Sequence, residues 1–340
     1  MQDPNRVIRI AVDAMGGDFA PEYPVLGSAE AARENSNIEL LVVGMEKRIK
    51  EILEKNAIDL PNLRIVNATE YITMDDLPSE VYKTKPDSSL NAALRLQRNR
   101  DAEALVSTSN TGAVLLHSTL KLGRISGIGR ATISAMIPAQ TGNTLLLDVG
   151  ATVDCRPAHL LEYAIMGSIY SRDILKIEKP RVGLLSIGEE KVKGNEVSLE
   201  AYELLEKAPI NFIGNVEGRD ITRGSVDVVV CDGFTGNIIL KFAESVLDLL
   251  KARLIQYAET GFTRKIWVGM MSKTLKKILK TFDYQEHGGA PLLGLNGVSV
   301  IGHGASTPYA IKKMIFRAEE MIREDINGKI AEALKKIKLT

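Results

Sequence analysis

Short aliphatic runs recur along the chain, and longer segments with a helical spacing of apolar positions separate most of them. The runs are rich in Val, Ile and Leu, a composition typical of strands that are buried on both faces of a parallel sheet. We therefore predict strands at Ile8–Val12, Glu39–Val43, Leu63–Val66, Ala104–Val106, Ile133–Ile137, Thr144–Asp148, Arg181–Ile187, Ile210–Ile213, Val226–Cys231 and Val298–Ile301.

The segments between these runs have the apolar spacing of helices that pack on one face. They predict helices at Val25–Glu34, Met45–Lys55, Ser89–Gln97, Val114–Lys121, Ala158–Ile174, Glu196–Lys207 and Ile238–Tyr257. Another helix is expected to begin at Ser306-Thr307-Pro308, because a hydroxyl cap followed by proline favours a helix start. We expect Asn327-Gly328 to interrupt this last helix.

The alternation of strands and helices predicts an α/β fold, with layers of helices around a mostly parallel sheet. Only the short segment Ala139–Gly142 joins Ile133–Ile137 to Thr144–Asp148. We expect these two strands to form an antiparallel hairpin, which would make the sheet mixed. A chain of 340 residues can bury a large core, and no low-complexity linker or short repeat marks a domain boundary.

The first predicted strand ends on Asp13, and the glycine pair Gly16-Gly17, then Asp18 and a helix start near Pro21, follow it. In α/β proteins, ligands bind at the carboxyl ends of strands. Glycine lets the backbone approach a ligand closely, and a helix N-terminus favours an anion. An ordinary turn has the same composition, so this segment alone leaves both interpretations open.

Similar turns, rich in glycine, amide and hydroxyl residues, recur along the chain. They are Ser107–Ala113, Asp148–Gly150, Gly188–Glu196, Gly214–Asp220, Asp232–Asn237, His287–Pro291 and Gly302–Ser306. We expect them to lie on one edge of the sheet and to form a cleft floored by backbone amides. Asn110 or Thr111 also suits a simple helix cap, and the lysines beside Gly194 also suit a solvated loop.

Composition and charge exclude several classes of protein. The chain has 43 Lys and Arg against 43 Asp and Glu, so its zero formal charge gives no indication of a nucleic-acid partner. Two cysteines, Cys155 and Cys231, make a disulfide framework improbable and favour a reducing cytosol. The N-terminus lacks the apolar core of a signal peptide, and no apolar run is long enough to span a membrane.

Common catalytic motifs are absent from the sequence. It contains no phosphate-binding P-loop, no G-x-S-x-G elbow and no H-E-x-x-H motif. Its four histidines lack the spacing of metal ligands, and Gly127-Ile-Gly129 lacks the third glycine of a dinucleotide fingerprint. Glycine-rich turns without a recognisable nucleophile indicate a reaction that depends on positioning and electrostatics.

The segment Phe262–Phe282 has six basic residues and no acidic one, and its apolar residues recur at helical spacing. It also contains the chain's single Trp, Trp267. A basic amphipathic helix of this kind is typical of a membrane-surface element. It also suits an acidic carrier protein, or a helix packed on the core or on a second copy of the chain. The candidate contact residues are Arg264, Lys265, Ile266, Trp267, Met270 and Met271.

Over nearly its whole length the chain resembles the acyl-acyl-carrier-protein:phosphate acyltransferase family of bacterial phospholipid synthesis, PlsX. The resemblance rests on the ordered blocks IAVDAMGGDFAPE, SNTGAVLLHSTLKLGRISGI, LLDVGATVDCRPAHLLEYAIMGSIY, PRVGLLSIGEEKVKGNE, INFIGNVEGRDI, VDVVVCDGFTGNIILK and GGAPLLGLNG. Two residues depart from the family pattern: Ser109 stands where glycine is usual, and Thr152 where asparagine is usual. A more distant similarity, at Asp232–Asn237, is to phosphotransacetylases.

The resemblance implies a three-layer α/β/α fold similar to the phosphotransacetylases and the isocitrate/isopropylmalate dehydrogenases, with two interlocked subdomains in a single domain over 1–340. Within it, 238–282 would form a projecting amphipathic helical hairpin. The implied reaction converts long-chain acyl-acyl-carrier protein and inorganic phosphate to acyl phosphate, which feeds phosphatidic acid synthesis. The implied partners are the carrier protein, the inner face of the cell membrane and a second copy of the chain in a homodimer. The resemblance implies no cofactor and no metal.

Site residues follow from placing this chemistry on the turns. We expect His303, Asn110 and Lys193 to be catalytic, with His303 assisting proton transfer, although a lone histidine at a strand end also suits a structural role. The candidates for phosphate are Gly16, Gly17, Asn110, Thr111 and Gly112, and we expect Lys193 and Asn195 to lie nearby. The full set of expected substrate-binding residues is Asp13, Gly16, Gly17, Asp18, Thr111, Gly112, Asp148, Asn195, Glu196, Asn215, Glu217, Asp232, Gly233 and Asn237.

Three other functions remain open at this point. A short acyl-coenzyme A would replace the carrier-bound acyl group in a phosphotransacetylase. A non-catalytic membrane scaffold would need none of the turn residues. A nicotinamide-dependent dehydrogenase shares the expected fold, but no dinucleotide fingerprint supports it.

Overall fold

The computed structural model describes residues 6–261, 264, 266, 268–271, 274 and 284–338. Its strands form an 11-stranded sheet in the order β3-β2-β1-β4-β11-β10-β5-β6-β9-β7-β8. The strands are β1 Ile8–Asp13, β2 Ile38–Gly44, β3 Leu63–Asn67, β4 Ala104–Ser107, β5 Thr132–Pro138, β6 Asn143–Leu147, β7 Val182–Leu185, β8 Phe212–Val216, β9 Val228–Val230, β10 Ala290–Leu293 and β11 Val298–Ile301. The predicted mixed, mostly parallel α/β fold is confirmed.

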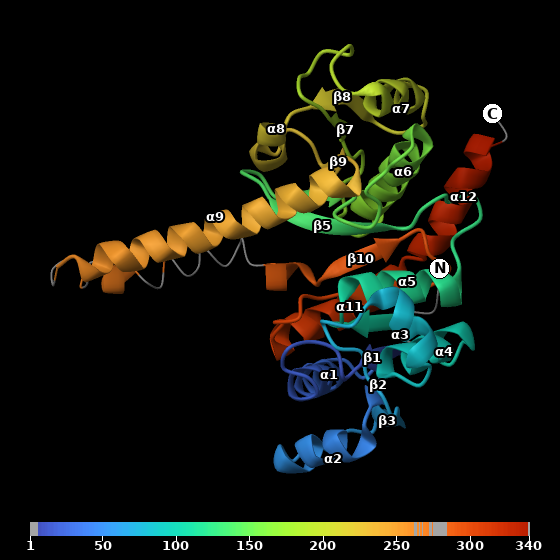
Figure 1. The fold of residues 1–340 in the computed structure, drawn as a ribbon, viewed down its shortest axis with the longest axis vertical. Helices are drawn as coiled ribbons and strands as arrows, with labels where there is room; N and C mark the ends of the chain where they lie inside the picture. The colour runs from blue at the N-terminus through green and yellow to red at the C-terminus, as the bar shows by residue number, and fades with distance from the viewer. Residues whose placement is uncertain are drawn as a thin grey trace.

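Helices cover both faces of this sheet (Figure 1). They are α1 Glu22–Glu34, α2 Glu46–Lys55, α3 Pro78–Thr84, α4 Ser89–Arg98, α5 Thr111–Leu122, α6 Pro157–Asp173, α7 Glu196–Glu206, α8 Gly218–Arg223, α9 Gly233–Glu259, the 3-10 helix η1 Tyr284–His287, α11 Pro308–Arg323 and α12 Ile326–Lys338.

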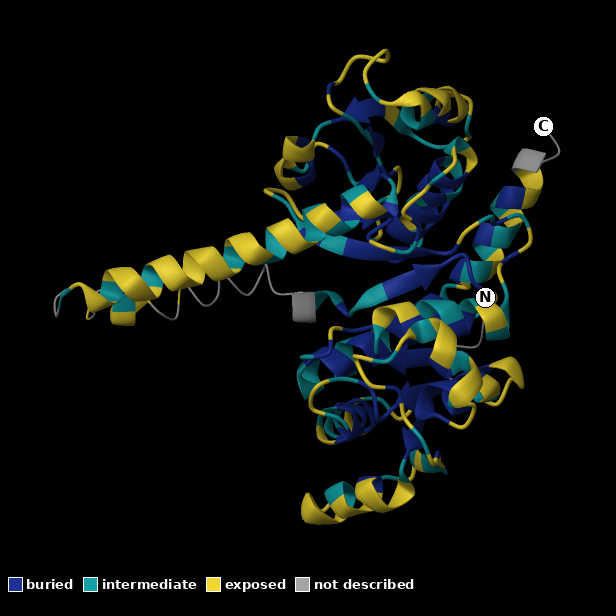
Figure 2. Ribbon diagram, viewed as in Figure 1, coloured by how far each residue is buried: buried dark blue, intermediate teal, exposed yellow. Residues whose placement is uncertain are grey.

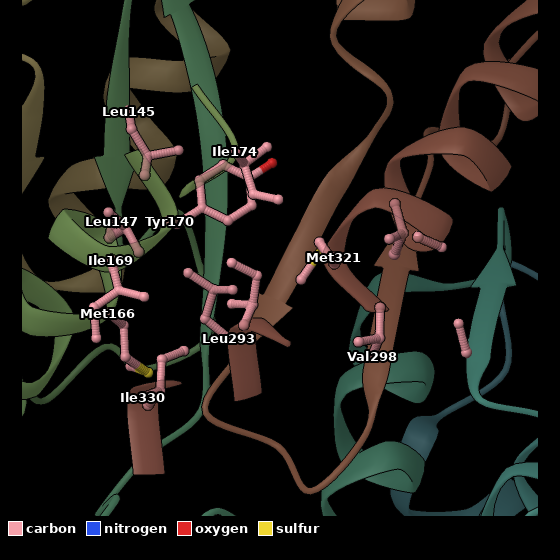
Figure 3. Close-up of a cluster of buried hydrophobic side chains, with 14 of the residues drawn as sticks. Leu145, Leu147, Met166, Ile169, Tyr170, Ile174, Leu293, Val298, Met321 and Ile330 are labelled. Carbon is pink, nitrogen blue, oxygen red and sulfur yellow. The ribbon is translucent and has the colours of Figure 1, made fainter. Parts of the chain in front are cut away.

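The strands are apolar at successive positions because each face is buried in a separate core. In β6, Leu145 and Leu147 pack into one cluster with residues of α6, such as Met166, whereas Leu146 belongs to the cluster on the other face. Figure 3 shows the first of these clusters, in which α6, β10 and the C-terminal helices contribute side chains. This arrangement explains why the sequence shows continuous hydrophobic runs rather than alternation.

Three antiparallel pairs occupy the centre of the sheet, and all other neighbouring strands are parallel. The predicted hairpin of β5 and β6 is confirmed by the pairing of Ser134 with Leu147. On the other side of β5 lies β10, which pairs antiparallel with β5 and with β11. β11 in turn runs parallel to β4. Consequently β6, β7, β8, β9 and β10 run in the opposite direction to β1, β2, β3, β4, β5 and β11.

Strand β10 is the main element that the hydrophobic pattern did not predict. We expected His287–Pro291 to be a turn, but the strand begins at Ala290, directly after Gly288 and Gly289. Glycine and proline are disfavoured inside strands, and the apolar run is only four residues long. Here Pro291 sits in the centre of the sheet opposite Val300, and its carbonyl accepts a hydrogen bond from Ser134 Oγ (3.1 Å).

The predicted start of the last helix is confirmed, because Thr307 Oγ1 caps α11 through the Ala310 N–H. The predicted break is displaced. The chain turns at Asp325, which has a φ of 49°, and Asn327-Gly328 lie inside the first turn of α12. The short helices α3 and α8 were not predicted either, because each has at most two turns and little apolar periodicity.

Helix α9 leaves the sheet and projects from the body of the protein (Figure 1). Along this helix only Gly233 and Gly236, in its first turn, are buried, and most of its surface is exposed (Figure 2). Its exposed side chains include apolar ones from Phe234 and Phe242 to Leu250. None of the helices within the described ranges combines the length and apolar character needed to traverse a bilayer.

Candidate active site

The carboxyl end of β1 places a fully enclosed carboxylate, Asp13, beneath the first glycine turn. Asp13 is 2% exposed. Its Oδ1 accepts hydrogen bonds from Ser89 Oγ (2.6 Å) and the Met15 N–H (3.2 Å), and its Oδ2 accepts one from Ser107 Oγ (2.8 Å). Burial raises the pKa of Asp13, against the opposing effect of these hydrogen bonds. Asp13 therefore ties the turn after β1 to β4 and to the start of α4.

The turn after β4 packs directly on the Gly16-Gly17 pair. Thr108 Oγ1 donates to the Gly16 carbonyl (2.7 Å). The Ser109 N–H donates to Ser107 Oγ (3.1 Å), so the same hydroxyl that holds Asp13 also fixes this turn. Gly16 has no room for a side chain, because a Cβ there would lie 2.7 Å from the Ser109 nitrogen.

The turn after β11 completes the arrangement. The Asp18 N–H donates to the Gly304 carbonyl (2.8 Å). A Cβ at Gly17 would lie 2.8 Å from Thr108 Oγ1 and 3.0 Å from the Gly304 carbonyl oxygen, and the φ of Gly17 is +98°. Only glycine suits a position with this φ and so little space. The three turns after β1, β4 and β11 thus meet at Gly17, and we call this meeting point the three-turn site.

Helix α5 begins at the three-turn site. Asn110 is its N-cap, because Asn110 Oδ1 accepts from the Ala113 N–H (3.1 Å), while Nδ2 donates to the Met74 carbonyl (2.9 Å). The structure therefore gives Asn110 the capping role that the sequence left open. The first N–H groups of a helix have no partner inside the helix, so Thr111 and Gly112 present donors that suit an anion.

His303 is exposed at the carboxyl end of β11. Its Nδ1 accepts a hydrogen bond from the Ala305 N–H (3.1 Å). Because Nδ1 is the acceptor, the neutral ring carries its proton on Nε2. The structure therefore places the His303 ring at the edge of the three-turn site, and its role in proton transfer stays a prediction.

A second group of turns surrounds Asp148, at the carboxyl end of β6. Asp148 is fully buried, and its carboxylate accepts from the N–H groups of Ile133 (3.2 Å), Ala151 (3.0 Å) and Thr152 (2.7 Å). Burial raises its pKa. Nearby, the Gly233 N–H donates to the Thr152 carbonyl (2.8 Å). The carboxylate orders the turn that supports the start of α9.

The other expected residues of this second group have structural contacts. Asp232 caps α9 through the Thr235 N–H (2.8 Å). Asn237 packs against Gly150, since a Cβ at Gly150 would lie 3.6 Å from Asn237 Cγ. These residues hold together the turns after β6 and β9.

The turns after β7 and β8 carry the remaining expected residues. Asn195 caps α7 through the Ser198 N–H (2.9 Å), and Glu196, the first residue of that helix, is exposed. Asn215 Nδ2 donates to the Glu190 carbonyl (2.8 Å). Lys193 is exposed in the loop before α7, and Glu217 forms an ion pair with Arg219 at 2.8 Å.

The expectation that all these turns share one edge is wrong. The turns after β1, β4 and β11 lie at one end of the strands, which we call the Asp13 end. β6, β7, β8 and β9 run in the opposite direction, so their turns lie at the other end, the Asp148 end. The reversal follows from the β5–β6 hairpin together with β10, which lies between β11 and β5 and sets these two strands parallel. The hairpin is readable in the sequence, but the position of β10 is not.

Four of the six expected membrane or carrier contacts lie within the described residues. Arg264, Ile266, Met270 and Met271 are all exposed. Arg264 Nη1 donates to Thr260 Oγ1 (2.7 Å), and the guanidinium lies 5.2 Å from the centre of the Tyr257 ring. Lys265 and Trp267 lie outside the described residues.

Sequence reasoning missed Ser89 and Thr108 as parts of the three-turn site. Ser89 appeared only as the start of a helix, yet its hydroxyl binds Asp13 from 76 positions along the chain. Thr108 stands in a hydroxyl-rich turn that was noted, but its contact with Gly16 depends on the parallel pairing of β1 and β4. The pattern of residues near each position in the sequence does not indicate either the contact of Ser89 with Asp13 or that of Thr108 with Gly16.

Neither cysteine suits the role of a nucleophile. Burial raises the pKa of Cys155 to about 11 and raises that of Cys231 well above its ordinary value. A thiol is nucleophilic as the thiolate, so both would be unreactive near neutral pH. Across the described part of the chain, no group of three or more His, Cys, Asp or Glu side chains is arranged to hold a metal ion.

Known proteins of similar sequence carry one name, phosphate acyltransferase. A family model described as "Fatty acid synthesis protein" matches residues 8–329. The chain is 47% identical over 324 residues to a phosphate acyltransferase of Desulforudis audaxviator, with 95% of each chain covered. It is also 47% identical over 330 residues to a phosphate acyltransferase of Desulfitobacterium hafniense, with 97% of each covered.

Solved structures agree on the fold. The EutD phosphotransacetylase from Staphylococcus aureus matches with a TM-score of 0.60 at 14% identity, over 96% of this chain and 94% of that one. A branched-chain phosphotransacylase from Enterococcus faecalis V583 matches with a TM-score of 0.57 at 14% identity, over 93% and 99% of the two chains. Fold and relatives together define an α/β acyltransferase. The chain belongs to the fatty acid synthesis protein family, which confirms the resemblance seen in the sequence.

Proposed function

We propose that the chain transfers the acyl group of a long-chain acyl-acyl-carrier protein to inorganic phosphate, giving acyl phosphate and the free carrier protein. The observation that carries this proposal is the three-turn site, in which backbone turns and the N-terminus of α5 converge. Such an arrangement of N–H groups favours an anion. The family, whose relatives bear the name phosphate acyltransferase, supports the same reaction.

In this reaction a phosphate oxygen attacks the thioester carbonyl carbon, and a tetrahedral intermediate with an oxyanion forms. The carbon–sulfur bond then breaks, and the thiolate leaves and takes up a proton as the free carrier thiol. Phosphate is already an anion and a thiol has a pKa of about 8.5, so neither attack nor departure needs a strong general base or acid. The site must hold phosphate against the carbonyl and stabilise the oxyanion.

The residues of the three-turn site divide this task between them. Thr111 and Gly112 would hold phosphate through their N–H groups, with Gly16 and Gly17 allowing its close approach. His303, through Nε2–H, would donate to the developing oxyanion or to the leaving thiolate. Lys193 and Asn195 lie at the Asp148 end of the strands. We therefore do not assign them a direct contact with the phosphate bound at the three-turn site.

The proposal is tested by mixing the protein with palmitoyl-acyl-carrier protein and inorganic phosphate. Acyl phosphate is followed by phosphorus NMR and the free thiol by a colorimetric reagent. We expect both products to appear only when phosphate is present. Thiol release from acetyl- or butyryl-coenzyme A alone would favour a phosphotransacetylase instead, and inactivity with every acyl donor would leave a non-catalytic scaffold.

We further propose that the projecting segment around α9 binds a membrane surface, where the greasy acyl product would be handed on. Support comes from the apolar side chains Phe234, Ile238, Phe242, Leu249 and Leu250, which are each between 50% and 68% exposed. Met270 is 63% exposed beyond the end of α9. Basic residues beside such a surface favour anionic lipid.

Replacing Met270 and Met271 together with glutamate should abolish sedimentation with anionic liposomes and leave activity on soluble substrate unchanged. Leu204→Glu, at a 37% exposed apolar position on α7, is the matched control and should sediment like the parent protein. Light scattering after size exclusion identifies a homodimer. If the double variant becomes monomeric and still sediments, the segment is a dimer contact and the membrane proposal fails.

A further inference from the structure

The three-turn site contains a buried hydroxyl that no neighbour satisfies. Ser109 is 1% exposed, and its Oγ has no hydrogen-bond partner among the described residues. A buried hydroxyl without a partner is unfavourable, and native structures rarely leave one without a reason. This serine is also one of the two residues that depart from the pattern of the family that the sequence resembles.

Ser109 lies at the point where two of the three turns touch. Its Cβ would be 2.8 Å from a Cβ placed on Gly16, so its side chain faces the Gly16-Gly17 turn. It directly precedes Asn110, the cap of α5. Because Asn110 Oδ1 is occupied by the Ala113 N–H, the cap leaves the N–H groups of Thr111 and Gly112 available beside Ser109.

The neighbouring hydroxyls are already committed to other partners. Ser107 Oγ donates to Asp13 and accepts from the Ser109 N–H, and Thr108 Oγ1 donates to the Gly16 carbonyl. Among the three buried hydroxyls of this turn, on Ser107, Thr108 and Ser109, the Ser109 hydroxyl is therefore the one that can still donate a hydrogen bond. Backbone N–H donors and a spare hydroxyl at the N-terminus of a 12-residue helix complement a ligand that only accepts hydrogen bonds, which is an oxyanion.

We propose that Ser109 is a phosphate-binding residue of this chain, and that its hydroxyl donates a hydrogen bond to an oxygen of the bound inorganic phosphate. The proposal rests on the proposed function, since it assigns one substrate of that reaction to a specific side chain. No bond to Ser109 is made or broken in the reaction. Its contribution is affinity for phosphate, so its removal raises the KM for phosphate and leaves the KM for the acyl-carrier protein unchanged.

The test compares Ser109→Ala with Ser118→Ala. Ser118 is a matched control, because its hydroxyl is also buried and without a partner among the described residues, but it lies within α5 and beyond the first turn of that helix. The net contribution of a hydrogen bond to a charged group corresponds to about a tenfold or larger change in binding affinity. We expect Ser109→Ala to raise the KM for phosphate by about tenfold, and Ser118→Ala to leave it unchanged.

A second readout does not depend on the reaction. Inorganic phosphate should raise the Tm of the parent protein and of Ser118→Ala, and raise that of Ser109→Ala much less at the same concentration. If Ser109→Ala retains the phosphate-dependent rise in Tm and the parent KM, the hydroxyl has a structural role alone and the inference is overturned. A protein that shows the phosphate-dependent Tm shift but releases no thiol would contradict the proposed function and leave the Ser109 inference standing.

Discussion

At the scale of single residues, the carboxylate of Asp13 connects the turn after β1 to its neighbours, because Ser89, Met15 and Ser107 all donate hydrogen bonds to it. Asp13, Gly16 and Gly17 were recognised because a carboxylate and two glycines directly follow a clear strand, and each has a specific contact in the structure. The sequence of the turn suits Asn110 either as a helix cap or as a ligand of phosphate. In the structure Asn110 Oδ1 accepts a hydrogen bond from the Ala113 N–H, so Asn110 is the cap of α5. The sequence does not indicate Ser89 as a site residue, because Ser89 and Asp13, which form a hydrogen bond, are 76 residues apart in the chain.

The buried carboxylate of Asp13 predicts a pH dependence of stability. Its pKa is raised by burial, so the folded chain holds this proton more tightly than the unfolded chain. The stabilisation is complete below the unfolded pKa of about 3.9 and is lost as the pH rises through the higher folded value. Relative to the parent protein, Asp13→Asn should therefore gain in free energy of unfolding as the pH is raised.

Urea denaturation at several pH values between about 4 and 8 measures this difference. Asp148→Asn should show the same direction, because burial also raises the pKa of Asp148. A difference between variant and parent that stays constant across the range would mean that the carboxyl keeps an ordinary pKa. A difference that moves the other way would mean that the hydrogen bonds outweigh burial.

At the scale of elements, the hydrophobic pattern predicted most of the strands and the longer helices well. β1, β2 and β11 were found within one residue of the predicted bounds, because their apolar runs are long or cleanly bounded. β8 begins two residues later than predicted, at Phe212, since Ile210 precedes the paired segment. β10 was missed because glycine and proline mark a turn in sequence, whereas pairing on both sides holds this segment extended.

The contact between α1 and α11 depends on one small residue. A Cβ at Gly27 would lie 2.7 Å from the Pro308 carbonyl oxygen and 2.8 Å from Ile311 Cβ. Backbone cannot move aside as a flexible side chain does, so Gly27→Ala should lower the free energy of unfolding by about 1–3 kcal/mol. Gly218→Ala, at the start of α8 where an added Cβ would meet no other atom within 4 Å, controls for the change from glycine and should cost less than about 0.5 kcal/mol.

Urea denaturation compares the two glycine variants with the parent protein. An equal effect of both substitutions would show that α11 shifts to accommodate the methyl group. In that case the close approach of the two helices would not be a constraint on the fold.

At the scale of the whole molecule, the sequence predicted the class of fold but not its division into two ends. The mixed sheet follows from the Ile133–Asp148 hairpin, which is readable as two apolar runs with a short connection. The position of β10 between β11 and β5 is not readable, since it joins segments about 160 residues apart. That pairing sets β5 parallel to β11, so the β5–β6 hairpin reverses β6, β7, β8 and β9 and separates the turns around Asp13 from those around Asp148.

Because β10 joins the two sets of strands, a destabilising substitution in β10 should lower the stability of both sets. Leu293 is fully buried in β10 and contributes to the core cluster of Figure 3. Leu293→Ala should lower the free energy of unfolding by about 2–5 kcal/mol. We expect the slowest-exchanging amides of β1 and of β9 to lose hydrogen-exchange protection by the same amount.

Ile49→Ala is the contrasting variant, since Ile49 lies in the small cluster under α2 and away from the centre of the sheet. Its effect on the amides of β9 should be smaller than its effect on those of β2. If Leu293→Ala exposes the amides of β9 and leaves β1 protected, the two sets of strands unfold separately.

The central position of β10 and β11 in the sheet also determines the order in which the strands can pair while the protein is being translated. β4 and β5 are made early, yet β11 and β10, the strands that join them, are translated only after the whole of α9. Until residue 301 has emerged, the nascent chain carries two unfinished sheets with open edges at β4 and β5. Open edges invite pairing with other chains, so the interval between residues 138 and 301 is the stage of synthesis at which this protein most needs protection by chaperones.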